Sequence, residues 1–175
     1  MTVFNTIDYL QHGNARQREA YKVLCDNNII TNLEGYTPFL AGTIPINIDV
    51  ENSDLDILCH YTNSGSFIKV LQKGFSHHSG FKISQKIING VNTVLANFYC
   101  NEFEIEVFGQ PVPVNQQAGY LHMIAEHQLL IKYGEAFRQE IISLKKSGYK
   151  TEPAFAKLLG LTGDPYTAIL NYAID

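Results

Sequence analysis

Residues 40–59 read LAGTIPINIDVENSDLDILC, and this stretch decides the fold. Near its end, Asp54 and Asp56 alternate with apolar residues. Side chains two residues apart in a strand share one face, so the two aspartates would lie roughly 7 Å apart along it, while Leu55 and Ile57 face a core. Two carboxylates on one strand face repel each other and resist burial. A divalent cation removes that cost, and oxygen ligands suit Mg²⁺ or Mn²⁺.

A third carboxylate is expected from the later stretch FEIEVF, residues 103–108. Glu104 and Glu106 alternate there with apolar residues, so both would share one strand face. Parity does not separate the two as a metal ligand. Glu106 is favoured because it lies nearer the end of the strand, with Glu104 in reserve.

The order of these residues resembles the nucleotidyltransferase superfamily. Its pattern is a Gly followed by a small residue, a loop of about ten residues, and Asp-apolar-Asp-apolar. Gly42-Thr43, the loop 44–53 and residues 54–57 carry the pattern here. The chain departs from it in having Thr43 where Ser is usual and Glu where the third carboxylate is more often Asp. The segments at 103–130 and 150–166 are further similar to a small bacterial family of nucleotidyltransferase-like proteins of unassigned function.

The resemblance implies a metal-dependent enzyme that transfers a nucleoside monophosphate from a nucleoside triphosphate to an acceptor hydroxyl. Asp54, Asp56 and Glu106 would be catalytic, with Glu104 as the alternative metal ligand. The acceptor would be a small molecule, a protein or an RNA. A second interpretation stays open, since Glu replaces Asp at the third position and Arg is scarce. In that case the chain is a catalytically degenerate protein that binds a nucleotide or a partner, as in toxin–antitoxin-like pairs.

Candidate phosphate contacts lie outside the carboxylates. Gly42 permits close approach of the backbone, and the Thr43 hydroxyl can bond a phosphate oxygen. Lys82 and Lys86 fall on one face of a later strand, where they would bind a triphosphate or keep an exposed sheet face soluble. Lys150 is a further candidate.

The pattern along the chain changes from strands to helices. We expect a helix at 14–28, strands at 37–41 and 53–60, a helix at 65–73, a hairpin of 81–88 and 91–100 around Asn89-Gly90, and a strand at 103–108. Helices are expected at 115–133, 135–147, 152–160 and 165–173. This order predicts an α+β fold: a mixed sheet with flanking helices in a core at 1–114, and a helical region at 115–175 packed on it.

Composition narrows the function classes. The net charge of −4 argues against general DNA binding. Three cysteines without close spacing favour reduced thiols, and no apolar stretch reaches the length of a membrane span, so we expect a cytoplasmic protein without membrane contact.

One further pair attracts a metal interpretation. His122 and Glu126 are four residues apart, which places them on one helix face. Their spacing fits neither of the common His-Glu zinc patterns. The sequence alone therefore predicts a supporting pair and not a zinc site.

Overall fold

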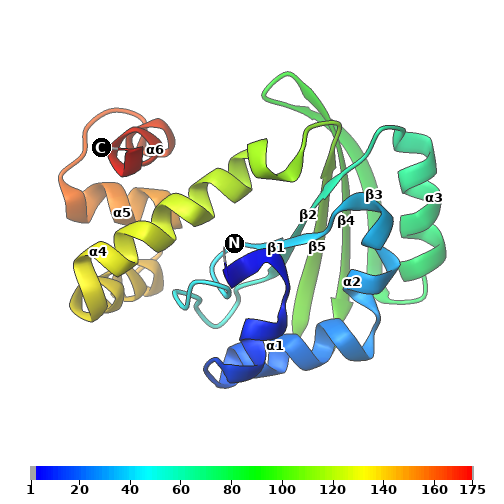
Figure 1. Cartoon of the computed structure of the whole chain (residues 1–175), viewed down its shortest axis with the longest axis horizontal. Helices are drawn as coiled ribbons and strands as arrows, with labels where there is room; N and C mark the ends of the chain where they lie inside the picture. The colour runs from blue at the N-terminus through cyan, green and yellow to red at the C-terminus, as the bar shows by residue number, and fades with distance from the viewer. Residues whose placement is uncertain (1–2, 175) are drawn as a thin grey trace.

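The computed structural model describes residues 3–174 and contains a five-stranded mixed sheet with helices on both faces (Figure 1). The strands are β1 (Phe39–Ala41), β2 (Leu55–His60), β3 (Ser79–Ile88), β4 (Val91–Cys100) and β5 (Phe103–Gln110). Their order across the sheet is β1-β2-β5-β4-β3. The β2 and β5 strands are parallel, and the other neighbours are antiparallel. The α+β class is therefore confirmed.

The helices agree with the expected order. They are α1 (Ala15–Asp26), α2 (Ile29–Asn32), α3 (Ser64–Phe75), α4 (Ala118–Lys146), α5 (Thr151–Leu159) and α6 (Pro165–Ile174). Short 3₁₀ turns lie at Val3–Asn5, Asp8–His12, Glu34–Tyr36 and Val114–Gln116. None of the helices within residues 3–174 combines the length and apolar character needed to cross a membrane.

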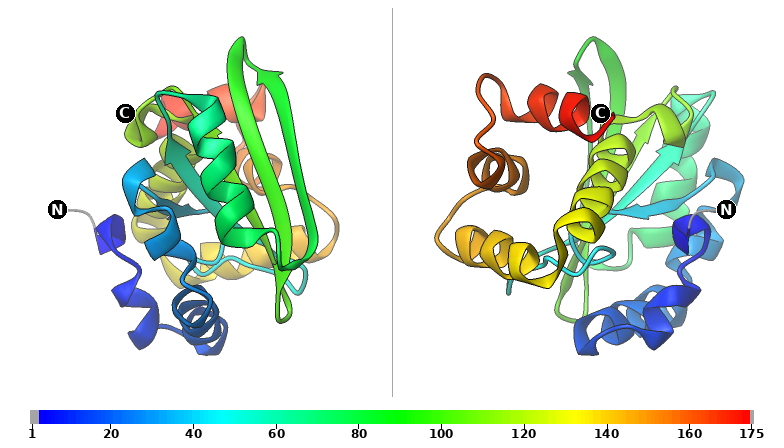
Figure 2. Two further views of the ribbon diagram at one scale, coloured as in Figure 1. Left: turned by 90° about the vertical axis from the view of Figure 1, so that its right-hand side faces the viewer. Right: turned by 60° about the vertical axis from the view of Figure 1, so that its left-hand side comes forward.

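The strand alternation separates two apolar cores. Leu55 and Ile57 are fully buried on the face that carries α1 and α3, together with Ile105 of β5. On the opposite face Leu58 packs in a second cluster that includes Met123 of α4. Figure 2 shows α3 and α4 on opposite sides of the sheet. Polar residues that share the parity of Leu58 therefore face α4.

The N-terminus of α1 is tied to the loop that follows β1. Asn14 and Gln17 form a capping box, in which the Asn14 side chain accepts a hydrogen bond from the Gln17 N–H at 2.8 Å. The Gln17 amide also donates to the carbonyl of Ile44 at 2.9 Å. The start of this helix thereby fixes the backbone just beyond Gly42.

The expected break between two helices at Gly134 is confirmed, whereas one expected strand boundary is wrong. Gly134 has non-helical angles (φ 76°, ψ −166°), so α4 consists of two helical segments joined at a kink there. The strand expected from residue 37 begins only at Phe39, because Thr37 is left-handed (φ 52°). The Asn89-Gly90 hairpin is confirmed, with φ of 50° and 78°.

Candidate functional site

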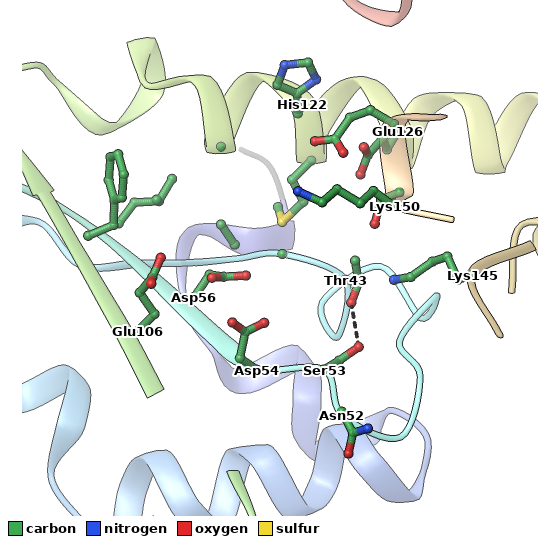
Figure 3. A pocket seen from close by; sticks show the side chains of 18 residues that line it. Thr43, Asn52, Ser53, Asp54, Asp56, Glu106, His122, Glu126, Lys145 and Lys150 are labelled. Carbon is green, nitrogen blue, oxygen red and sulfur yellow. Dashed lines mark hydrogen bonds between the residues drawn. The ribbon is translucent and has the colours of Figure 1, made fainter. Parts of the chain in front are cut away.

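A cavity of about 680 Å³ opens between the sheet and the helices α4 and α5 (Figure 3). Its lining comes from five parts of the chain that are far apart in sequence. They are the turn after β1, the start of β2, the middle of β5, one face of α4 and the segment that begins α5. The lining residues that carry polar chemistry are Thr43, Asn52, Ser53, Asp54, Asp56, Glu106, His122, Glu126, Lys145, Lys150, Thr151 and Glu152.

The three carboxylates expected from the sequence lie together in this cavity. Asp56 is directly opposite Glu106 in the parallel register of β2 and β5. Asp54 precedes Asp56 by two residues and lines the same wall, as Figure 3 shows. Parallel pairing of β2 with β5 thus brings together Asp56 and Glu106, which are far apart in the sequence.

Burial acts strongly on the aspartates. Burial, together with the charges of Asp54 and Glu106, raises the pKa of Asp56 to about 7. Burial also raises the pKa of Asp54, with a contribution from Glu104. A carboxylate that resists ionisation in this way is stabilised by any cation that the cavity admits.

Glu104 and Glu106 are separated by their surroundings. Glu106 lines the cavity, whereas Glu104 is not among the lining residues. Asn97 of β4 donates to both, at 3.1 Å to Glu106 and 3.4 Å to Glu104, and the Tyr99 hydroxyl lies 3.4 Å from Glu104. Both side chains therefore contact Asn97, but of the two only Glu106 faces the cavity.

The Gly42-Thr43 turn packs directly against Asp56. Gly42 has φ +81°, and a Cβ at this position would clash with the Asp56 carboxylate. The Thr43 hydroxyl is 3.3 Å from that of Ser53, which accepts a hydrogen bond from the Val50 N–H at 2.9 Å. Glycine is therefore required both by the backbone angle and by the proximity of the carboxylate.

The lysines at the cavity agree only in part with those expected. Lys86 lines a separate hollow near Asn63. Lys82 is exposed on β3, opposite Asn97 and in the same cross-strand row as Glu106, but it does not line the cavity. Lys145 and Lys150 line the cavity. The Lys145 ammonium donates to the carbonyl of Ile48 at 2.7 Å, and burial lowers its pKa. No local spacing marks Lys145, because its position depends on the bend of α4.

A second group of titratable side chains faces the same cavity from the helices. His122 and Glu126 of α4 meet Glu152 of α5, with candidate ligand atoms all within 4.8 Å of one another. Burial lowers the pKa of His122 and raises that of Glu126 well above its usual value. The sequence places His122 and Glu126 on one face but gives no signal for Glu152, which arrives through the turn between α4 and α5.

Solved structures with the same fold are nucleotidyltransferases. Cid1, an RNA terminal uridylyl transferase, aligns with a TM-score of 0.55 at 8% identity over 79% of this chain and 45% of its own. Cid1 poly(U) polymerase with Mg and 3′-dATP bound gives 0.54 at 10% identity over 93% and 52%. A cytoplasmic RNA terminal U-transferase gives 0.50 at 12% identity over 75% and 41%. The chain spans about half the length of these proteins, and the likeness establishes a nucleotidyltransferase-like fold.

Comparison at the level of sequence gives a family without an assigned activity. No curated protein matches the chain. The family described as "Domain of unknown function (DUF4269)" matches over residues 22–172, which is most of the sequence. The chain therefore belongs to the DUF4269 family.

Proposed function

We propose that this protein is a metal-dependent nucleotidyltransferase that transfers a nucleoside monophosphate from a nucleoside triphosphate to an acceptor hydroxyl. The observation that carries the proposal is the convergence of Asp54, Asp56 and Glu106 beside Gly42-Thr43 in one open cavity. The two aspartates lie at the start of β2, Glu106 lies on β5 and the turn follows β1, and all of them line the wall of the cavity that faces α4.

The carboxylates fit a hard divalent cation. Their donors are all oxygens, they are partly buried, and Asp56 carries a pKa of about 7 because burial and two neighbouring carboxylates oppose its ionisation. Asp54, Asp56 and Glu106 would hold Mg²⁺ or Mn²⁺, with Glu104 in reserve behind Asn97. When bound, the ion would neutralise charge on the phosphate oxygens and favour in-line displacement.

The rest of the wall supplies groups for the triphosphate. Because Gly42 carries no side chain, the backbone of the Gly42-Thr43 turn lies against Asp56, so a phosphate held beside Asp56 would meet this backbone. Lys145 and Lys150 add positive charge on the opposite side of the cavity. Of the three lysines that the sequence suggests as phosphate contacts, Lys150 lines the cavity, whereas Lys82 and Lys86 do not.

The helices α4 and α5 form the remaining wall and would receive the acceptor. Glu106, together with Asp54 or Asp56, would help activate the acceptor hydroxyl as the transfer proceeds. Similar structures support this reaction class: Cid1 has been solved with bound MgGTP and with its product ApU. Those ligands belong to Cid1, and the acceptor of the present chain is left open.

The proposal is tested by locating metal and nucleotide together. Crystals soaked with MnCl₂ and a non-hydrolysable nucleoside triphosphate should show an anomalous Mn signal between Asp54 and Asp56. Calorimetric titration of the same analogue should lose its Mn dependence in Asp56→Asn and keep it in Asp26→Asn, an exposed aspartate at the end of α1. Analogue binding unaffected by Asp56→Asn would refute the assignment.

Measuring pyrophosphate release distinguishes an enzyme from a catalytically degenerate binding protein. Slow release of pyrophosphate from a triphosphate, lost in Asp56→Asn, supports an enzyme. Metal-dependent binding without any pyrophosphate release, across all four ribonucleotides, supports the degenerate binding protein instead.

A further inference from the structure

His122, Glu126 and Glu152 form a compact set of metal-binding side chains away from the sheet. Their candidate ligand atoms lie within 4.8 Å of one another, a separation that a small rotation of side chains closes onto one ion. His122 and Glu126 are one helical turn apart on α4, the same i, i+4 spacing that lets two side chains of known zinc helices share an ion. Glu152 completes the set from the first turn of α5.

Two of these groups are buried without partners. Glu126 is 4% exposed and His122 is 9% exposed. Within residues 3–174, neither Oε1 of Glu126 nor Nδ1 of His122 has a hydrogen-bond partner. An unpaired polar atom in the interior costs about 1–3 kcal/mol, so two of them in one cluster call for a ligand that satisfies both.

The nearby cations do not supply that ligand. Lys145 acts on Glu126 electrostatically, but its ammonium donates to the carbonyl of Ile48. The ion pairs found among the described residues include neither Glu126 nor Glu152. The cluster therefore keeps two carboxyl groups and an imidazole without a committed positive partner.

An ion has access to the cluster from two sides. His122 and Glu152 line both the main cavity and a second hollow near Tyr166, while Glu126 faces the main cavity. The rings of His122 and Tyr166 meet in a T-shaped arrangement, with centroids 5.7 Å apart. Figure 3 shows His122 and Glu126 side by side on α4, above the carboxylates of the sheet.

We propose that His122, Glu126 and Glu152 bind one Zn²⁺ ion, at a site separate from Asp54, Asp56 and Glu106. One nitrogen and two carboxylate oxygens form a three-ligand set that zinc accepts, with a fourth position open to the cavity. An imidazole ligand favours zinc over magnesium. From the sequence, His122 and Glu126 are expected only to support each other, because Glu152 cannot be placed beside them. With Glu152 as a third ligand, the three side chains can bind an ion.

The ion would tie α5 to α4 beside the cavity. Glu152 is the ligand from α5, so binding would restrain the segment that also carries Lys150 into the cavity wall. The inference does not depend on nucleotidyl transfer, because it uses different residues and a different metal.

The test isolates this site from the one on the sheet. Zn²⁺, and Co²⁺ as a spectroscopic probe, are titrated into the full chain and into Asp54→Asn/Asp56→Asn, which removes two ligands of the sheet site. We expect one equivalent in Asp54→Asn/Asp56→Asn, with Co²⁺ absorption bands of a four-coordinate ion, and the same bands in the parent together with any second equivalent held by the sheet site. In the double-variant background, Glu126→Gln and Glu152→Gln should each weaken binding at least about 10-fold, since a direct ligand matters no less than the groups that support it.

Control variants exclude unfolding and generic surface binding. Glu140→Gln alters an exposed carboxylate of α4 and should keep full affinity. Glu126→Gln should melt no lower than the parent in EDTA, because it removes a buried unpaired carboxyl group. Absence of Zn²⁺ binding in Asp54→Asn/Asp56→Asn, or binding that survives both Glu126→Gln and Glu152→Gln, would overturn the proposal.

Discussion

At the residue scale, Asp56 shows how a functional group opposes folding. Its pKa is raised to about 7 by burial and by the neighbouring Asp54 and Glu106, against an ordinary value near 3.9. The native state thus binds a proton that the unfolded state has released between about pH 4 and 7. Stability therefore falls as pH rises through this window.

Asp56→Asn should accordingly stabilise the metal-free protein above pH 7. We expect the free energy of unfolding to rise by about 1–2 kcal/mol at pH 8 and to change little at pH 4. The gain at pH 8 is smaller than the whole pKa shift would give, because the open cavity admits water. Urea unfolding in EDTA at the two pH values measures it. The exposed Asp26→Asn serves as the control for loss of a carboxylate outside the cavity. A gain at pH 4 equal to that at pH 8 would contradict ionisation as the cause.

Gly42 is a second residue at which a single substitution tests the site, because its backbone lies against Asp56. Gly42→Ala places a Cβ at φ +81° and against the Asp56 carboxylate. The backbone angle alone costs about 1–2 kcal/mol, and the clash adds to it. Gly90→Ala is the matched control, because Gly90 has φ +78° with nothing within 4 Å of a Cβ. Equal losses of unfolding free energy in the two variants would show that contact with Asp56 is unimportant.

At the scale of the elements, the sequence predicts what is local. Alternation of Glu104 and Glu106 with apolar residues and the Asn89-Gly90 turn place the strands within about two residues. Gly134 likewise marks the kink that divides α4. The expected start of the first strand is wrong, because Thr37 adopts a left-handed angle. This angle is not visible in the hydrophobic period, since it depends on how the neighbouring segments pack.

The bend at Gly134 offers a test of element geometry. A Cβ there would meet nothing within 4 Å, so Gly134→Ala acts only through φ +76°. We expect a loss of about 1–2 kcal/mol in unfolding free energy, or a straightened α4 that displaces Lys145. Gly35→Ala is the control, since its Cβ is equally unobstructed and its φ lies outside the left-handed region. A Gly134→Ala variant as stable as the parent would contradict the bend.

At the scale of the whole molecule, the cavity joins groups whose proximity no local pattern encodes. That Asp54 and Asp56 share one face can be predicted from the sequence, because the two residues are only two positions apart in one strand. The approach of Glu106 needs parallel β2–β5 pairing, and the approach of Lys145 and Lys150 needs the packing of α4 across the sheet. The carboxylates and Lys150 expected from the sequence line the cavity, whereas Lys82 and Lys86 do not, and no pattern predicted Lys145.

The exchange of lysines gives the last prediction. Lys150 is exposed at the start of α5 and lines the cavity, so Lys150→Met should remove charge without disturbing the core. A hydrogen bond to a charged group contributes about 1.5–3 kcal/mol, reduced by solvent here, so we expect the Mn-dependent affinity for a triphosphate analogue to fall about 3–10-fold. Lys86→Met, the same change in a separate hollow on the sheet, should leave that affinity unaltered. Isothermal titration calorimetry at fixed ionic strength measures both. A greater loss in Lys86→Met than in Lys150→Met would place the phosphates along β3 and not between the sheet and α4.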